Sequence, residues 1–149
     1  MTRPVIMGFP RRYVQGPGVR GQLGELLTVF ASSVAIVVDD LMWEEYGSQI
    51  CKSLSDSNIS FQRLAFNGEC TQAEIRNLSE SAFDVDCILA VGGGKAIDTG
   101  KGVSLALGCE VVVFPTIASN DSPTSRLIVV YSDTHVLEAA EKMALNPAA

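Results

Sequence analysis

The chain has 149 residues, 47% of them hydrophobic and 19% charged, which is the composition of one globular domain and excludes general disorder. Its net charge of −6 excludes the basic surface on which nucleic-acid binding depends. No apolar run approaches the roughly 20 residues of a membrane span, no signal-peptide core opens the chain, and the four cysteines form no CxxC pair, so we expect a cytoplasmic protein with buried free thiols.

The first four predicted elements alternate between strand and helix. Ser33–Asp40 is a β-branched run that ends in two carboxylates, and it predicts a buried parallel strand. Apolar residues recur at helical spacing over Trp43–Leu54, and Ser60–Phe66 alternates as a strand does. A threonine followed three residues later by a glutamate is the capping-box pattern, and it predicts a helix over Thr71–Phe83.

The alternation continues along the second half of the chain. A strand is predicted over Cys87–Val91, a helix over Lys95–Leu107 and a strand over Glu110–Phe114. Leu127–Tyr131 is a further apolar strand, and residues 135–145 predict a helix with the only histidine on the surface at its start. Repeats of this length predict an α/β fold, a Rossmann-like parallel sheet with helices on both faces.

Three polar segments follow strands of the predicted sheet. They are Asp39-Asp40, Gly92–Lys95 and Pro115–Ser119. Ligands of parallel sheets bind beyond the carboxyl ends of the strands, and these ends meet at one edge. The sequence therefore predicts a ligand site at this edge.

The segment Gly92-Gly93-Gly94, called the glycine turn below, joins a strand to a helix. Glycines there let the backbone approach a ligand with its N–H groups exposed, and the positive end of the helix dipole favours a phosphate. The turn is not the dinucleotide fingerprint GxGxxG, because Ile97 occupies the third glycine position, and it is not a P-loop, because Gly102 stands where Ser or Thr should hold magnesium. The alternative is a turn without a ligand, but three consecutive glycines make such a turn costly in conformational entropy, so we favour a phosphate site.

Carboxylates accompany each part of the predicted edge. Asp39 or Asp40 could bind the two hydroxyls of an adenosine ribose and repel a 2′-phosphate, which implies NAD over NADP; the alternative is a cap for the next helix. Asp98 could cap backbone N–H groups or accept hydrogen bonds from a ligand. Asp121 lies in the hydroxyl-rich loop Pro115–Ser125, where it could bind a polyol, although residues of these types also simply form turns.

Five segments of the chain carry motifs of one known enzyme family. They are GGGKAIDTGKG at Gly92–Gly102, PTIASNDSPTS at Pro115–Ser125, VVYSD at Val129–Asp133, FNGECTQAEI at Phe66–Ile75 and RRYVQGPG at Arg11–Gly18. These segments resemble the glycerol dehydrogenase branch of the iron-containing (group III) alcohol dehydrogenases. The resemblance implies an enzyme that oxidises glycerol to dihydroxyacetone with NAD and a divalent metal, usually zinc.

The resemblance also assigns roles to single residues. It implies that Asp40 binds the adenosine ribose and that Asp121 contacts the polyol substrate. The cofactor contacts that it implies at the pyrophosphate and beyond are Gly92, Gly93, Gly94, Lys95, Asp98, Thr116, Ser119, Ser125, Leu127 and Tyr131.

The family's metal ligands, one aspartate and two histidines, belong to a second, helical half that this sequence lacks. The resemblance therefore implies that residues 1–149 are the NAD-binding N-terminal domain, cut short near its end before a further apolar strand. We expect this domain to bind NAD and to be catalytically inactive alone, with no catalytic or metal-binding residue of its own. A sheet edge left open by a missing strand favours a homo-oligomer.

Two other functions stay open at this point. One is a fragment of an enzyme like glycerol-1-phosphate dehydrogenase, whose glycine turn is similar but whose substrate phosphate favours a basic site. The other is a stand-alone nucleotide-binding module that never had a catalytic half.

Overall fold

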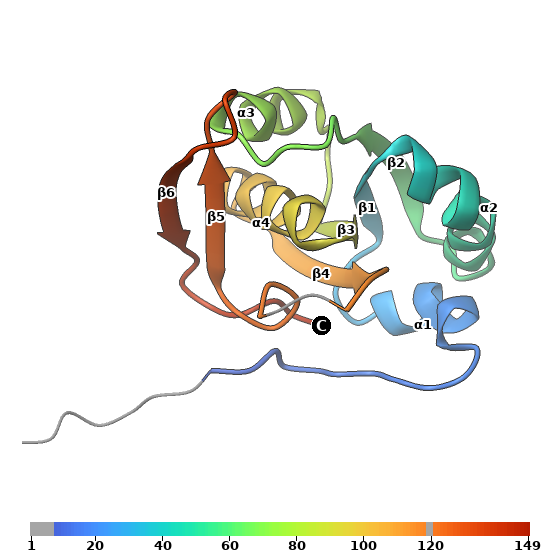
Figure 1. Cartoon of the computed structure of the whole chain (residues 1–149). Coiled ribbons are helices and arrows are strands. Elements are labelled where there is room, and N and C mark those ends of the chain that lie inside the picture. The colour runs from blue at the N-terminus through green and yellow to red at the C-terminus, as the bar shows by residue number, and fades with distance from the viewer. Residues whose placement is uncertain (1–7, 119–120) are drawn as a thin grey trace, which may run out of the picture.

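The computed structural model describes residues 8–118 and 121–149. The elements, in chain order, are η1 (Val19–Gln22), α1 (Leu23–Leu27), β1 (Ser33–Val38), α2 (Asp40–Asp56), β2 (Ser60–Ala65), α3 (Gln72–Ser81), β3 (Cys87–Gly92), α4 (Gly94–Leu107), β4 (Glu110–Pro115), β5 (Leu127–Tyr131) and β6 (Leu137–Lys142). Four parallel strands form one sheet in the order β2-β1-β3-β4, and β5 and β6 form a separate antiparallel pair beside α4 (Figure 1).

Side chains of the central strands alternate between two apolar cores, one on each face of the sheet. In β1, Val34 and Ile36 face the core made with α1 and α2, whereas Ala35 and Val37 face the core made with α3, α4 and β5. All five residues Val34–Val38 are fully buried. Burial on both faces explains why the strand is a continuous apolar run, as the prediction of a buried parallel strand required.

The order of the sheet reverses between β1 and β3. The chain passes from β1 to β2 on one side and then returns to β3 and β4 on the other. In open α/β sheets ligands bind at this kind of reversal, beyond the carboxyl ends of the two strands. Asp39 follows β1 there, and the glycine turn follows β3.

The starts of two helices are set by side-chain caps. Asp39 Oδ1 accepts a hydrogen bond from the backbone N–H of Met42 at 2.8 Å, so α2 begins at Asp40 rather than at Trp43 as predicted. Thr71 Oγ1 accepts from the backbone N–H of Glu74 at 3.0 Å, which confirms the predicted cap of α3.

The helix predicted over residues 135–145 is wrong, because this segment forms β6 and pairs with β5. A tight turn precedes β6, in which His135 has a φ of 60° and its N–H donates to the carbonyl of Ser132 at 2.9 Å. Ala139 and Met143 on β6 and just after it pack against the core that contains β5. Pairing and burial of alternate residues thus outweigh the helix-favouring composition of this segment. His135 is exposed as predicted, but in a hairpin turn.

Two of the four cysteines are buried and all four are free. Burial raises the pKa of Cys70 to about 11 and that of Cys87 to about 12, so both thiols stay protonated at neutral pH. Cys51 and Cys109 are only half-buried, which departs from the predicted full burial. Of the helices described, none combines the length and the apolar character that crossing a membrane requires.

The open side of β4 is partly covered by the chain itself. The backbone N–H of Ala148 donates to the carbonyl of Val111, and that of Val113 donates to the carbonyl of Ala149, both at 2.8 Å. Arg12 N–H in turn donates to the carbonyl of Ala148 at 3.1 Å. The edge strand expected to be open is therefore paired along part of its length.

Candidate cofactor-binding site

The glycine turn has a geometry that favours glycine most strongly at its first position. Gly92 has a φ of 146°, and a Cβ there would lie 2.7 Å from Ala96 Cβ. A Cβ on Gly93 would lie 2.9 Å from Ile117 Cδ1. The backbone of the turn therefore carries no side chain at Gly92 and Gly93, at the edge of the sheet.

The N-terminus of α4 opens directly from this turn. Gly93 is its N-cap residue, and no side chain of the described residues caps it. Helix α4 is 14 residues long, so its dipole leaves a positive partial charge at these N–H groups. An uncapped helix N-terminus at the reversal of the strand order fits a pyrophosphate.

Asp98, one turn further along α4, is buried and accepts three hydrogen bonds. Its Oδ1 accepts from Ser122 Oγ at 2.6 Å and from Lys101 Nζ at 3.1 Å, and its Oδ2 accepts from the backbone N–H of Val129 at 3.1 Å. The prediction left open whether Asp98 caps N–H groups or binds a ligand. The structure shows a cap on the first part of β5, and the role toward a cofactor stays a prediction.

Lys101 is fully buried, and sequence reasoning missed it. Its ammonium donates to Asp98 and to the carbonyl of Leu127 at 2.8 Å. Burial lowers the pKa of Lys101, and the Asp98 carboxylate opposes that effect. We call Asp98, Lys101 and Ser122 the α4 clamp, because they fasten the first turns of α4 to β5 and to the loop before it.

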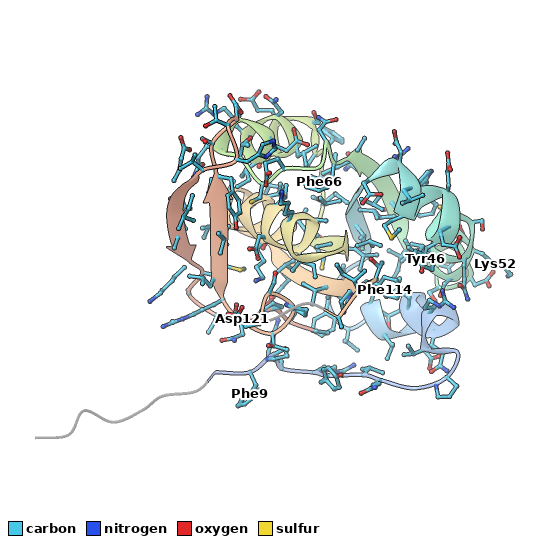
Figure 2. All side chains as sticks on the ribbon, in the orientation of Figure 1. Phe9, Tyr46, Lys52, Phe66, Phe114 and Asp121 are labelled. Carbon is cyan, nitrogen blue, oxygen red and sulfur yellow. The ribbon has the colours of Figure 1, made fainter. Side chains whose placement is uncertain are left out.

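The α4 clamp places Ser122, from the hydroxyl-rich loop, beside the glycine turn. The hydroxyl oxygen of Ser122 lies 3.3 Å from the carbonyl oxygen of Gly94, and the same hydroxyl forms a hydrogen bond with Asp98. Asp121, the neighbour of Ser122, is exposed (Figure 2). The Asp121 carbonyl accepts from the N–H groups of Thr124 and Ser125 at 2.9 and 2.7 Å. The backbone of Asp121 is therefore fixed one residue from the contact between Ser122 and Gly94, and its role toward a polyol stays a prediction.

Other predicted cofactor residues gather around the same helix end. Thr116 N–H donates to the carbonyl of Gly92 at 3.0 Å, and Ser125 Oγ accepts from Leu127 N–H at 3.3 Å. Lys95 Nζ lies 5.6 Å from the ring centre of Tyr131. Ser119, the remaining predicted contact, lies outside the described residues.

Glu69 is a second group that the sequence did not single out. Its Oε2 accepts from Lys95 Nζ at 2.6 Å and lies 2.5 Å from His135 Nδ1. Burial would raise the pKa of Glu69, but the hydrogen bonds from Lys95 and His135 lower it overall. Glu69 thus holds the ammonium of Lys95 near the start of α4. In the sequence, the only signal for Glu69 is its place in the family motif at Phe66–Ile75.

The two aspartates after β1 differ in their contacts and in their exposure. Asp39 is engaged as the cap of α2, whereas the side chain of Asp40 is 86% exposed. Asp40 forms an ion pair with Arg63 of β2, whose guanidinium carbon lies 5.0 Å from the ring centre of Trp43. Of the two, Asp40 therefore has the more exposed carboxylate, and its role toward a ribose stays a prediction.

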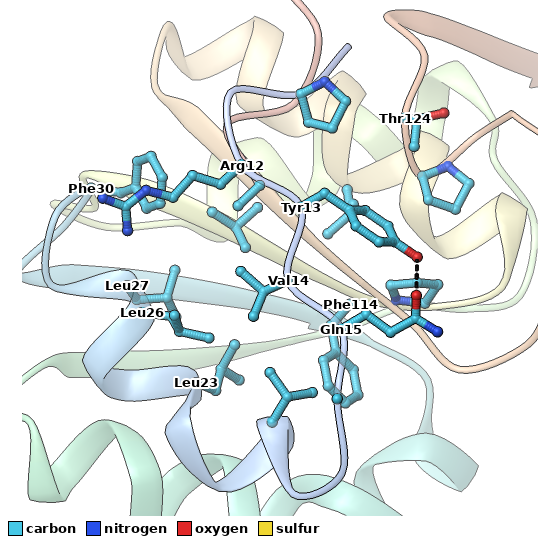
Figure 3. Close-up of a pocket in the computed structure, with 18 residues that line it drawn as sticks. Arg12, Tyr13, Val14, Gln15, Leu23, Leu26, Leu27, Phe30, Phe114 and Thr124 are labelled. Atoms are coloured by element: carbon cyan, nitrogen blue, oxygen red, sulfur yellow. Dashed lines mark hydrogen bonds between the residues drawn. The ribbon is translucent and has the colours of Figure 1, made fainter.

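An apolar groove of about 310 Å³ lies between the segment before η1, α1 and β4, and it extends to Pro115, the strand partner of Gly92 (Figure 3). Leu23, Leu27, Phe30 and Phe114 form much of its wall. Arg12 is the one charged side chain on the part of this wall that the structure describes, so we do not assign a phosphate to the groove. Over residues 8–118 and 121–149, no three His, Cys, Asp or Glu side chains are grouped so that they could hold a metal ion.

Comparison with known proteins connects this site to one family. Residues 10–149 match the family described as iron-containing alcohol dehydrogenase. The chain is 38% identical over 130 residues to a glycerol dehydrogenase of Escherichia coli O6:H1, covering 86% of this chain and 35% of that protein. It is 36% identical over 126 residues to a glycolaldehyde reductase of Halobacterium salinarum, covering 83% of this chain and 34% of that protein.

A solved structure supports the same connection. The crystal structure of glycerol dehydrogenase from Schizosaccharomyces pombe superposes with a TM-score of 0.88 at 29% identity, covering 99% of this chain and 38% of that one. The chain thus spans about a third of the length of the relatives that it matches.

Proposed function

The chain belongs to the iron-containing alcohol dehydrogenase family, and on that premise we propose that it is the NAD-binding part of a glycerol dehydrogenase. The observation that carries the proposal is the uncapped N-terminus of α4 behind the glycine turn, at the reversal of the strand order. A polyol substrate, a cytoplasmic location and a homo-oligomeric assembly belong to the same proposal.

The proposed cofactor lies across the edge of the parallel sheet from β1 to β4 and reaches β5 of the antiparallel pair. Its pyrophosphate binds the N–H groups of the glycine turn and the ammonium of Lys95, and its adenosine ribose binds Asp40. Thr116, Ser119, Ser125, Leu127 and Tyr131 contribute the remaining contacts, as the resemblance implies. This arrangement is supported by the position of Thr116 beside Gly92 and of Tyr131 beside Lys95.

NAD supplies the acceptor for a hydride from the carbon that bears the substrate hydroxyl. In this proposal the residues of this chain bind and orient the cofactor and the polyol. Asp121 accepts a hydrogen bond from a hydroxyl of the polyol, and the α4 clamp fixes the loop on which Asp121 stands. Both carboxylate oxygens of Asp98 already accept hydrogen bonds within the chain, so in this proposal Asp98 serves the cofactor by holding the loop around Ser122 and β5 in place.

Titration of NAD into the chain, followed by calorimetry, tests the proposal. We expect binding that weakens about tenfold or more in Lys95→Met, because the variant loses a charge-assisted hydrogen bond to a phosphate. Lys52→Met is the matched control, since Lys52 is also exposed and paired, but with Asp56 at the far end of α2. An absence of NAD binding by the unaltered chain would overturn the proposal.

The metal that the resemblance implies does not fit the described residues, which offer no group of three ligands, so we derive no step through it. Ionising an alcohol near neutral pH without a metal is very unfavourable. We therefore expect the 149-residue chain, given NAD, glycerol and zinc, to form no NADH above the rate of a protein-free blank. Steady absorbance at 340 nm checks this, and turnover by the pure chain would contradict it.

A further inference from the structure

Arg63 lies beside Asp40, the carboxylate to which the proposed function assigns the adenosine ribose. It is on β2, the neighbour of β1, and its guanidinium forms an ion pair with Asp40 and stacks on Trp43. The side chain of Arg63 is 28% exposed, and its Nε has no hydrogen-bond partner among the described residues. Stacking and the ion pair together hold the guanidinium beside the carboxylate to which the proposed function assigns the ribose.

The two charges have opposite effects on a 2′-phosphate. A carboxylate at the ribose hydroxyls favours NAD because it repels the phosphate, whereas an arginine beside the ribose accommodates that phosphate and so favours NADP. A guanidinium carries five N–H donors, and one of its terminal nitrogens, Nη2, is occupied by Asp40. Its Nε is buried, so the donors open to a phosphate are those of the terminal nitrogens.

We propose that Arg63 is a specificity-determining residue of this site. While Asp40 is ionised, it occupies the guanidinium, and the site binds a dinucleotide without a 2′-phosphate. When the charge of Asp40 is removed, the guanidinium turns its donors to a 2′-phosphate, and the site accepts NADP. This inference rests on the proposed binding of NAD at the glycine turn and goes beyond it by naming the group that decides between the two cofactors.

Four forms of the chain test the inference: the unaltered chain, Asp40→Asn, Arg63→Gln and the double variant. Calorimetry measures the dissociation constants of NAD and NADP for each. We expect the unaltered chain to bind NADP at least tenfold more weakly than NAD. Asp40→Asn is expected to bind NADP about tenfold or more tightly than the unaltered chain does, and the double variant is expected to lose that gain. Arg63→Gln retains the Asp40 carboxylate, so it is expected to bind NADP no more tightly than the unaltered chain does.

Trp43 provides a second readout, because it is the only tryptophan of the chain and carries the stacked guanidinium. We expect NADP to change the Trp43 emission of Asp40→Asn but not that of the double variant. Asp56→Asn is the matched control, since it removes the same charge from the same helix in an exposed pair with Lys52. We expect Asp56→Asn to leave the ratio of the dissociation constants of NAD and NADP unchanged.

The outcomes separate the two proposals. If NAD binds but Asp40→Asn leaves the ratio unchanged, or if the double variant keeps the gain, the role of Arg63 is overturned and the proposed function stands. If neither dinucleotide binds any of the four forms, both are overturned. Thermal melting shows whether each variant is folded, and Asp40 can be replaced with little risk because its side chain is 86% exposed.

Discussion

Replacement of Lys101 by methionine is expected to lower the free energy of unfolding by about 3–5 kcal/mol. Methionine fills the same space, but it leaves the Asp98 carboxylate buried without its cationic partner and the carbonyl of Leu127 without its donor. Urea unfolding measures the change through a shift of the midpoint at constant slope.

Two further variants make this prediction specific to the α4 clamp. Lys52→Met removes an exposed lysine and is expected to change stability by less than about 1 kcal/mol. The double variant of Asp98→Asn and Lys101→Met is expected to lose less than the sum of the two single losses, because the buried charge is then gone. Equal losses for Lys52→Met and Lys101→Met would show that the α4 clamp is not a stabilising network.

Replacement of Gly92 by alanine is expected to destabilise the chain by about 3 kcal/mol, the sum of backbone strain and overpacking. Gly92 has a φ of 146°, and the added Cβ would meet Ala96 Cβ at 2.7 Å. The turn must then shift, so NAD binding is expected to fall below detection in the same variant. Thermal melting and calorimetry measure the two effects.

Gly16→Ala is the matched control for this variant. Gly16 lies before η1, and a Cβ there would meet no atom within 4 Å. Its stability and NAD affinity are expected to stay close to those of the unaltered chain. A Gly92→Ala variant that binds NAD normally would contradict the geometry assigned to the glycine turn.

The parallel sheet could be predicted because its central strands are apolar on both faces. Residues Val34–Val38 are buried on both faces of the sheet. No polar residue interrupts this apolar run, so the sequence predicts a buried parallel strand. The segment 135–145 could not be predicted in this way. Its alanine, glutamate and lysine residues favour a helix locally, and only pairing with β5 makes it a strand.

The candidate site was predictable where neighbouring residues create it. The glycine turn and the cap of α3 follow from a few consecutive residues. The partners of Asp98 lie 24 and 31 residues away at Ser122 and Val129, and no local pattern specifies such contacts. The pair of Asp40 and Arg63 likewise depends on how β1 and β2 pair and on where α2 begins, which the sequence does not state.

The central claim is that NAD binds at the N-terminus of α4, and amide chemical shifts of the isotope-labelled chain test it most directly. On titration with NAD, the account predicts that the largest shifts occur at the amides of the glycine turn, Lys95 and Thr116, with smaller ones around Asp40. Shifts confined to the groove at Leu23 and Phe114, or no shifts at saturating NAD, would contradict the account.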